Sequence, residues 1–245
     1  MRKREILANL SYTFNGDWTK IADGVASGIM PRDFHITENY ITVLDKEYPD
    51  EFFGLRHPPW VIFYEGDYSL LNSKKITIVG TRKPTEYGKE MTKFVVNNIK
   101  DRYTTVSGLA KGIDGYVHRF SLDRGKTIGI IGSGLGTEYP SENRDIYKEM
   151  KKSHLILSEY PHHVGIQKRH FPWRNRLLAA LGDKLIVVEA KIQSGTILTV
   201  NEAISLSKDI YCIPHDITNK YGEGCNKLIA EGAYSIYDEI QLKEL

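Results

Sequence analysis

The sequence predicts an α/β protein with one mostly parallel, doubly wound sheet. From residue 75 onward, short β-branched runs alternate with amphipathic segments of helical periodicity. Several of these runs lead into glycine-containing turns, as strands do at the carboxyl edge of an open parallel sheet. The chain has 245 residues, 41% of them hydrophobic, which suffices for one sizeable core. A parallel sheet covered by helices is the consistent solution.

The first part of the chain differs from the rest. Residues 1–38 contain a short helical candidate, a glycine break at 24–28 and no strong strand, so we expect a reduced N-terminal leader or cap. Residues 39–245 are expected to form the main domain. A strand-like segment from Ile41 and the run at 60–64 should add strands to its sheet rather than form a separate fold.

The remaining elements follow in order from their periodicity. The predicted strands cover residues 76–79, 104–106, 127–131, 155–157, 185–188 and 210–213. The predicted helices cover residues 86–100, 113–123, 141–151, a segment around 179, 196–206 and 226–230. Because strands and helices alternate, successive strands are expected to run parallel.

Composition limits the function classes. The balance of 33 Lys and Arg against 31 Asp and Glu gives a net charge of +2, so a nucleic-acid site would need local clustering of cations. Cys212 and Cys225 have no CxxC spacing, and no signal-peptide pattern is present, so we expect a reduced, cytoplasmic location. No apolar stretch approaches the about 20 residues that span a bilayer, which argues against a membrane role.

Residues 167–176 provide such a local cluster. This run, QKRHFPWRNR, combines Lys and Arg side chains with a histidine and two aromatic rings. Cationic side chains pair with backbone phosphates, and an aromatic ring stacks an unpaired base, which is worth about 1–3 kcal/mol per base. The run therefore predicts a surface for single-stranded nucleic acid.

Glycine-containing turns provide a second cluster. They follow four predicted strands, at 80–82, 107–112, 132–134 and 194–196. These turns should meet at one sheet edge, where backbone N–H groups at helix starts can hold anions. Arg82 is the strongest candidate because its fork can take a phosphate bidentately; the alternative is a salt bridge to a neighbouring helix. Ser107 and Ser194 are expected to cap helices.

Acidic side chains suggest other chemistry. Glu159 and Glu189 both end strands, and a hydrolase would use such a pair for acid–base catalysis. We expect them instead to pair with nearby arginines. Asp114 and His118, four residues apart on a helix, have a metal-ligand spacing but no third ligand, so capping and packing are expected. No catalytic residue, metal or cofactor is predicted.

Six short motifs follow one another along the chain. They are 78–84 (IVGTRKP), 107–114 (SGLAKGID) with His118, 157–161 (LSEYP), 171–176 (FPWRNR), 187–196 (VVEAKIQSGT) and 224–233 (GCNKLIAEGA). In this order they resemble the signature of the DNA-processing protein A (DprA/Smf) family. The resemblance extends from about residue 41 to residue 237.

The resemblance implies an extended Rossmann-like domain that binds single-stranded DNA without catalysis. It further implies that the protein protects incoming single strands and helps load a RecA-type recombinase during natural transformation. The family's DNA pocket corresponds here to Arg82, Lys168 and Phe171. With the turns described above, the expected DNA-binding residues are Gly80, Thr81, Arg82, Ser107, Gly108, Lys111, Lys168, Phe171, Arg174, Asn175, Arg176, Ser194 and Gly195.

The resemblance also bears on additional domains and on oligomeric state, for which it implies a homodimer. Its members often carry a longer N-terminal helical module and a C-terminal winged helix; here we expect only the reduced leader and no winged helix. An apolar stripe of Ile229, Ile236, Ile240 and Leu242 would supply a dimer interface, unless these side chains belong to the core.

Two alternative functions stay open on sequence grounds. One is a nucleoside-monophosphate phosphoribohydrolase of the lysine-decarboxylase-like group, whose hallmark is a PGGxGT run; the nearest stretches here, 132–138 and 194–196, both lack the Pro-Gly-Gly lead. The other is an interaction protein whose cationic run contacts an acidic protein surface.

Overall fold

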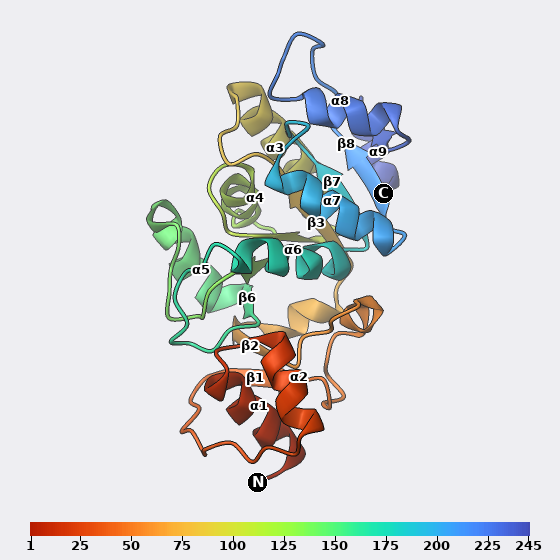
Figure 1. The fold of residues 1–245 in the computed structure, drawn as a ribbon. Coiled ribbons are helices and arrows are strands. Elements are labelled where there is room, and N and C mark those ends of the chain that lie inside the picture. The colour runs from red at the N-terminus through yellow and green to blue at the C-terminus, as the bar shows by residue number, and fades with distance from the viewer.

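The computed structural model describes residues 1–245, and its centre is a nine-stranded sheet in the order β1-β2-β6-β5-β4-β3-β7-β8-β9 (Figure 1). The strands are β1 (Asn39–Thr42), β2 (Val61–Gly66), β3 (Lys75–Val79), β4 (Thr104–Ser107), β5 (Thr127–Ile131), β6 (Leu155–Ser158), β7 (Lys184–Val187), β8 (Asp209–Cys212) and β9 (Tyr234–Ser235). The seven strands β3 to β9 pair with one another in parallel. At one edge, β2 pairs antiparallel with β6, and β1 pairs antiparallel with β2. The predicted mostly parallel α/β sheet is confirmed.

Helices connect the strands as the alternation predicted. They are α1 (Lys3–Thr13), α2 (Trp18–Ala26), α3 (Glu86–Ile99), α4 (Ile113–Ser121), α5 (Arg144–Ser153), α6 (His170–Leu181), α7 (Gly195–Ser205), α8 (Glu223–Ala230) and α9 (Glu239–Glu244). Short 3-10 turns lie at η1 (Asp50–Gly54), η2 (Tyr68–Asn72) and η3 (Ser141–Asn143). The sequence did not predict α2, α9 or β9. All three elements are short, and α9 and β9 also lie close to the C-terminal end of the chain.

The sheet is buried on both faces. Ile76 and Ile78 of β3 pack with apolar side chains of α3 and α4, whereas Val79 packs on the opposite face with α6 and α7. This alternation between the two buried faces is the period-2 geometry of a strand. A third apolar cluster joins α1, α5 and β2 near the antiparallel edge. Helices therefore cover both faces, as a parallel sheet requires.

The N-terminal helices are tied to the segment before β2. The Trp18 indole donates to the Pro58 carbonyl at 2.7 Å, and the Trp60 indole donates to the Trp18 carbonyl at 3.2 Å. Asp17 caps α2 by accepting from the Lys20 backbone N–H at 3.2 Å. The expected cap thus contains two helices, and these contacts join it to the chain beyond residue 39.

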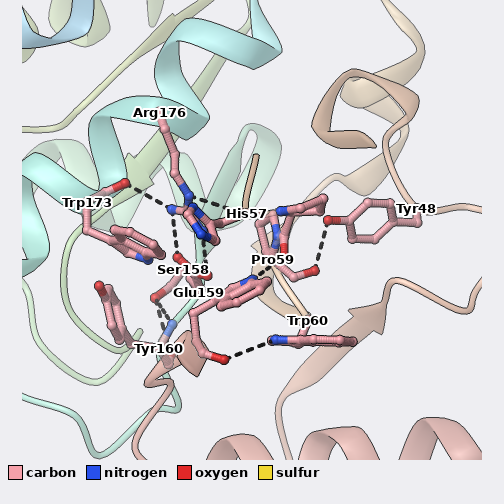
Figure 2. A network of polar contacts seen from close by, with 11 residues as sticks. Tyr48, His57, Pro59, Trp60, Ser158, Glu159, Tyr160, Trp173 and Arg176 are labelled. Carbon is pink, nitrogen blue, oxygen red and sulfur yellow. Dashed lines mark hydrogen bonds and ion pairs between the residues drawn. The ribbon is translucent and has the colours of Figure 1, made fainter. Parts of the chain in front are cut away.

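A buried ion pair holds α6 against the turn after β6 (Figure 2). Arg176 donates to both carboxylate oxygens of Glu159, at 2.9 and 2.7 Å. It also donates to the carbonyls of Trp173 at 2.9 Å and His57 at 3.2 Å. The two side chains are 6% and 5% exposed, and four hydrogen bonds hold the guanidinium inside the protein.

The apolar stripe expected to form a dimer interface is not continuous. Ile236 and Leu242 are buried in the core with α3, and Ile229 is partly buried against the other face. Of the four side chains, only that of Ile240 is well exposed, at 57%. The sequence pattern could not separate these outcomes because β9 and α9 were not predicted as elements that bury one side.

The Arg176 pair generates a stability prediction. Glu159→Gln would leave the buried guanidinium without its countercharge, and we expect the free energy of unfolding to fall by about 3–5 kcal/mol. Glu149→Gln is the matched control because Glu149 pairs with Lys152 at the surface, where loss of a pair costs about 1 kcal/mol or less. Urea unfolding measures both, and equal effects of the two substitutions would contradict the assignment.

Candidate nucleic-acid interface

A cleft of about 750 Å³ opens at the carboxyl edge of the sheet. It lies where the strand order reverses, since β4, β5 and β6 extend to one side of β3 while β7, β8 and β9 extend to the other. Open α/β sheets bind ligands at this switch point because the loops diverge there. Residues from the turn after β3, from the loop after β7 and from α6 line the cleft.

The turn that carries Arg82 is fixed on both sides. The Thr81 N–H donates to the Glu189 carbonyl at 2.7 Å, and the Thr81 carbonyl accepts from the Ile113 N–H at 3.1 Å. A side chain at Gly80 would collide with Ile113, since an added Cβ would lie 2.5 Å from its Cγ1. Gly112 has φ +75°, and an added Cβ there would lie 2.4 Å from the Thr81 carbonyl oxygen. The backbone is therefore rigid while the Arg82 side chain stays exposed.

Arg82, Lys168 and Phe171 meet in this cleft. The Arg82 guanidinium lies over the Phe171 ring, 5.2 Å from its centroid, and Lys168 lines the same cleft. Both cations are exposed, and neither has an ion-pair partner. The alternative of a salt bridge between Arg82 and a neighbouring helix is therefore not observed. Two free cations beside an aromatic face can hold a phosphate and stack a base.

Arg174 also lines the cleft, but it is anchored. It is 3% exposed, donates to the Gly108 carbonyl at 2.7 Å and also donates to the Ile130 carbonyl. Asp114, 7% exposed, is attracted to both Arg174 and Arg82. Burial raises the pKa of Asp114 and lowers the pKa of Arg174, because each loses hydration. Arg174 thus adds a fixed positive charge behind the cleft.

Arg176 is placed elsewhere. It lies on the opposite side of α6, where Glu159 and backbone carbonyls accept its hydrogen bonds. Arg176 was expected to bind DNA, but it does not line the cleft. The expected pairing of Glu159 with an arginine is confirmed. For Glu189 that expectation is wrong, because its carboxylate accepts from Thr85 N–H at 2.8 Å and from Thr85 Oγ1 at 2.6 Å. The two glutamates do not form a carboxylate pair in the cleft.

The loop after β4 contributes to a smaller recess beside the cleft. This recess, about 40 Å³, shares Arg82 and Phe171 with the cleft and is also lined by Gly108 and Lys111. Lys111 is paired with Glu142. Ser107 does not reach either space, because its buried hydroxyl donates to the Ile78 carbonyl at 2.7 Å. It is not the cap of α4 either, since that helix begins after Gly112.

The loop after β7 forms the opposite wall. Ser194 and Gly195 line the cleft beside Asn175, whose amide donates to the Gly195 carbonyl at 3.4 Å. Ser194 precedes α7, but its hydroxyl makes no cap bond and is buried without any partner. An added side chain at Gly195 would meet nothing within 4 Å, so the wall stays open there.

Sequence reasoning missed several cleft residues, among them Tyr139, Ile166 and Leu198. The Tyr139 ring lies 6.0 Å from the Phe171 ring, and Ile166 and Leu198 expose apolar surface at the rim. No signal in the sequence marked Tyr139, because it lies in a loop between β5 and η3 whose path depends on tertiary contacts. Its ring widens the aromatic surface that an unpaired base can contact.

The other polar candidates are internal. His118 is fully buried and its Nδ1 lies 2.8 Å from Thr127 Oγ1, which is the packing role expected of it. Cys225 is buried as well, with Cys212 and His215 beside it. Hydrogen bonding from the Cys212 thiol and from His215 lowers the pKa of Cys225. His215 had not been recognised as a neighbour from sequence, but neither cysteine reaches the cleft.

The fold and this site define an α/β protein with a cationic, aromatic-lined cleft at the switch point of its sheet. Comparison with known proteins gives the particular family. Residues 39–244 match the family described as DNA recombination-mediator protein A. The chain belongs to this family.

Similar proteins include curated relatives and solved structures. DNA processing protein DprA of Bacillus subtilis is 40% identical over 202 residues, covering 81% of this chain and 68% of the relative. The structure of DNA processing protein A from Streptococcus pneumoniae has a TM-score of 0.85 at 31% identity, covering 98% of this chain and 92% of that one. The structure of DNA processing protein A from Helicobacter pylori, described for its single-stranded DNA binding mode, has a TM-score of 0.77 at 30% identity, covering 86% of this chain and 95% of that one.

None of the helices combines the length and the apolar character that crossing a bilayer requires.

The buried imidazole of His118 generates a pH prediction. Burial lowers its pKa from 6.5 to about 3, so between these values only the unfolded state binds the proton. The free energy of unfolding should therefore fall as the pH drops through this window. We expect the loss between about pH 7 and about pH 5 to be about 2 kcal/mol larger in the wild type than in His118→Gln. Urea unfolding at both pH values checks this; parallel losses would contradict it.

Proposed function

We propose that this chain binds single-stranded DNA in the cleft between the turn after β3, the loop after β7 and helix α6. The observation that carries the proposal is the position of the unpaired Arg82 guanidinium over the Phe171 ring, with Lys168 in the same cleft. Phosphates would lie against the two cations, and an unpaired base would stack on Phe171. Arg174 would reinforce the positive potential without direct contact.

Family membership supports single-stranded DNA as the ligand. The Helicobacter pylori relative is described as binding single-stranded DNA, and its fold covers most of this chain. The cleft offers little base-edge readout, since its polar side chains serve phosphates or hold the walls. We therefore infer that binding has slight sequence preference.

The wider role proposed here is that of a recombination mediator. The protein would coat and protect incoming single strands and help load a RecA-type recombinase, in the cytoplasm and during natural transformation. It would act as a homodimer and by binding rather than by catalysis, without a cofactor. Asp114 is the single carboxylate that lines the cleft, so the cleft lacks the pair of acids that a hydrolase of this kind would use.

The cations generate the first test. Arg82→Glu and Lys168→Glu should each weaken binding of an oligothymidylate by about tenfold or more, because an attractive phosphate contact becomes repulsive. In Arg82→Gln, the slope of log affinity against log salt should fall in magnitude by about 0.7, the value for one phosphate on a single strand. Fluorescence anisotropy at several salt concentrations measures both quantities.

Lys93→Glu is the control for these variants. Lys93 is an exposed, unpaired cation of α3 that does not line the cleft, so it carries the same charge change away from the site. If Lys93→Glu weakened binding as much as Arg82→Glu, a general field rather than the cleft would account for affinity. An unchanged salt slope in Arg82→Gln would remove Arg82 from the phosphate contacts.

Phe171 generates a prediction that is independent of charge. Phe171→Leu keeps an apolar side chain but loses the stacking face, so binding should weaken by about 1–3 kcal/mol with an unchanged salt slope. Phe171→Tyr keeps the ring and should bind nearly as the wild type does. Anisotropy titrations of the two variants make the comparison, and equal affinities for Leu and Tyr would refute stacking at this position.

A further inference from the structure

A second pocket lies on the other side of α6. It has a volume of about 210 Å³, below the about 300–1,000 Å³ of sites for drug-sized ligands. The turn at 15–19, whose last two residues begin α2, forms one wall, and Tyr160, His170 and Trp173 form much of the rest. Arg169 stands at its edge. Three large aromatic side chains therefore surround a space suited to one flat ring system: Trp18, Tyr160 and Trp173.

Helix α6 separates this pocket from the cleft. Phe171, Arg174, Asn175 and Leu178 follow helical spacing and line the cleft, whereas His170 and Trp173, three residues apart, line the second pocket. The residues before the helix divide in the same way. Lys168 lines the cleft, and Arg169, the next residue, lines the pocket. The two sites are thus separated by the first turns of one helix, which is about 10–12 Å wide with its side chains.

The pocket is held in shape by contacts that do not depend on a ligand. The Tyr160 and His170 rings are stacked at 3.9 Å between centroids. Gly16 has φ +73° and approaches so closely that an added Cβ would lie 2.8 Å from the Tyr160 ring. The Trp18 indole is fixed by its hydrogen bond to the Pro58 carbonyl. Aromatic walls fixed in advance bind a flat ligand without an ordering cost.

The polar groups at the rim suit a nucleotide. Arg169 is exposed, and its side chain donates only to the Gln167 side chain, at 3.1 Å, with no acidic partner. Its guanidinium is therefore free for a phosphate. Asp17, which caps α2, also lines the pocket and offers a carboxylate oxygen to the amino or imino group of a base.

We propose that this pocket takes a second unpaired base of the same DNA strand, after the backbone has crossed the N-terminal end of α6 at Lys168 and Arg169. The base would lie among Trp18, Tyr160 and Trp173, with Arg169 on the adjoining phosphate. This inference rests on the proposed function, because the cleft positions the strand. It extends the binding path beyond the cleft and onto the N-terminal part of the chain.

Tryptophan fluorescence provides a specific readout. The chain has three tryptophans, and none of them lines the cleft. Trp18 and Trp173 line the pocket, and the ring of the third, Trp60, lies 5.5 Å from that of Trp18. An oligothymidylate of about 4 nucleotides should bind in the cleft and leave the emission nearly unchanged. One of about 16 nucleotides should reach the pocket and quench it. Anisotropy, measured in parallel, reports binding at either site.

Variants separate the two sites. Arg169→Glu should weaken binding of the longer oligonucleotide by about fivefold or more and leave the shorter one unaffected. Lys20→Glu is the control, since Lys20 is an exposed cation that follows the same turn but does not line the pocket. Trp18→Phe and Trp173→Phe keep an aromatic wall, so affinity should hold while the quenching falls.

The outcomes distinguish this inference from the proposed function. Tight binding of both oligonucleotides, with no quenching and no effect of Arg169→Glu, would overturn the second site and leave the cleft intact. Binding of neither oligonucleotide would overturn both. Quenching by the longer strand alone, reduced in Arg169→Glu and not in Lys20→Glu, is the result expected.

Discussion

The position of helix α6 against the carboxyl edge of the sheet is the constraint on which the binding surface depends. Two buried arginines of this helix are held in different ways. Arg174 reaches backbone carbonyls at the ends of β4 and β5, whereas Arg176 meets the carboxylate of Glu159 after β6. Burying an arginine is costly unless its donors are satisfied, so each contact fixes the helix strongly. Phe171 can therefore face the cleft in a defined position.

The distribution of charge follows from this arrangement. Within one ten-residue run, the buried cations hold the fold together and the exposed ones, Lys168 and Arg169, remain without acidic partners. Arg82 joins them from a turn that is distant in sequence but fixed by Glu189 and Ile113. A net charge near zero is thus compatible with a locally positive surface, since ion pairs neutralise many of the other cations.

Much of the fold could be predicted from sequence, because strand and helix periods alternate plainly from β3 to β8. The meeting of Arg82 with Phe171 was also anticipated, because the family resemblance assigned both residues to one DNA pocket. The sequence could not show which arginines face the interior of the protein. Arg174 and Arg176 are two positions apart and look equivalent in a cationic run, and only the packing of α6 shows that Arg176 points away from the cleft. Tyr139 and the turn at 15–19 depend on loop paths, for which local sequence offers little guide.

The turn at 15–19 has a consequence for variation among relatives. The match to the family model begins at residue 39, whereas Trp18, which precedes it, lines the same pocket as Tyr160 and Trp173, which lie inside the matched region. The pocket therefore combines residues inside the region matched by the family model with residues that precede it. Relatives with a different N-terminal segment would keep the cleft while this neighbouring pocket changes its shape or disappears.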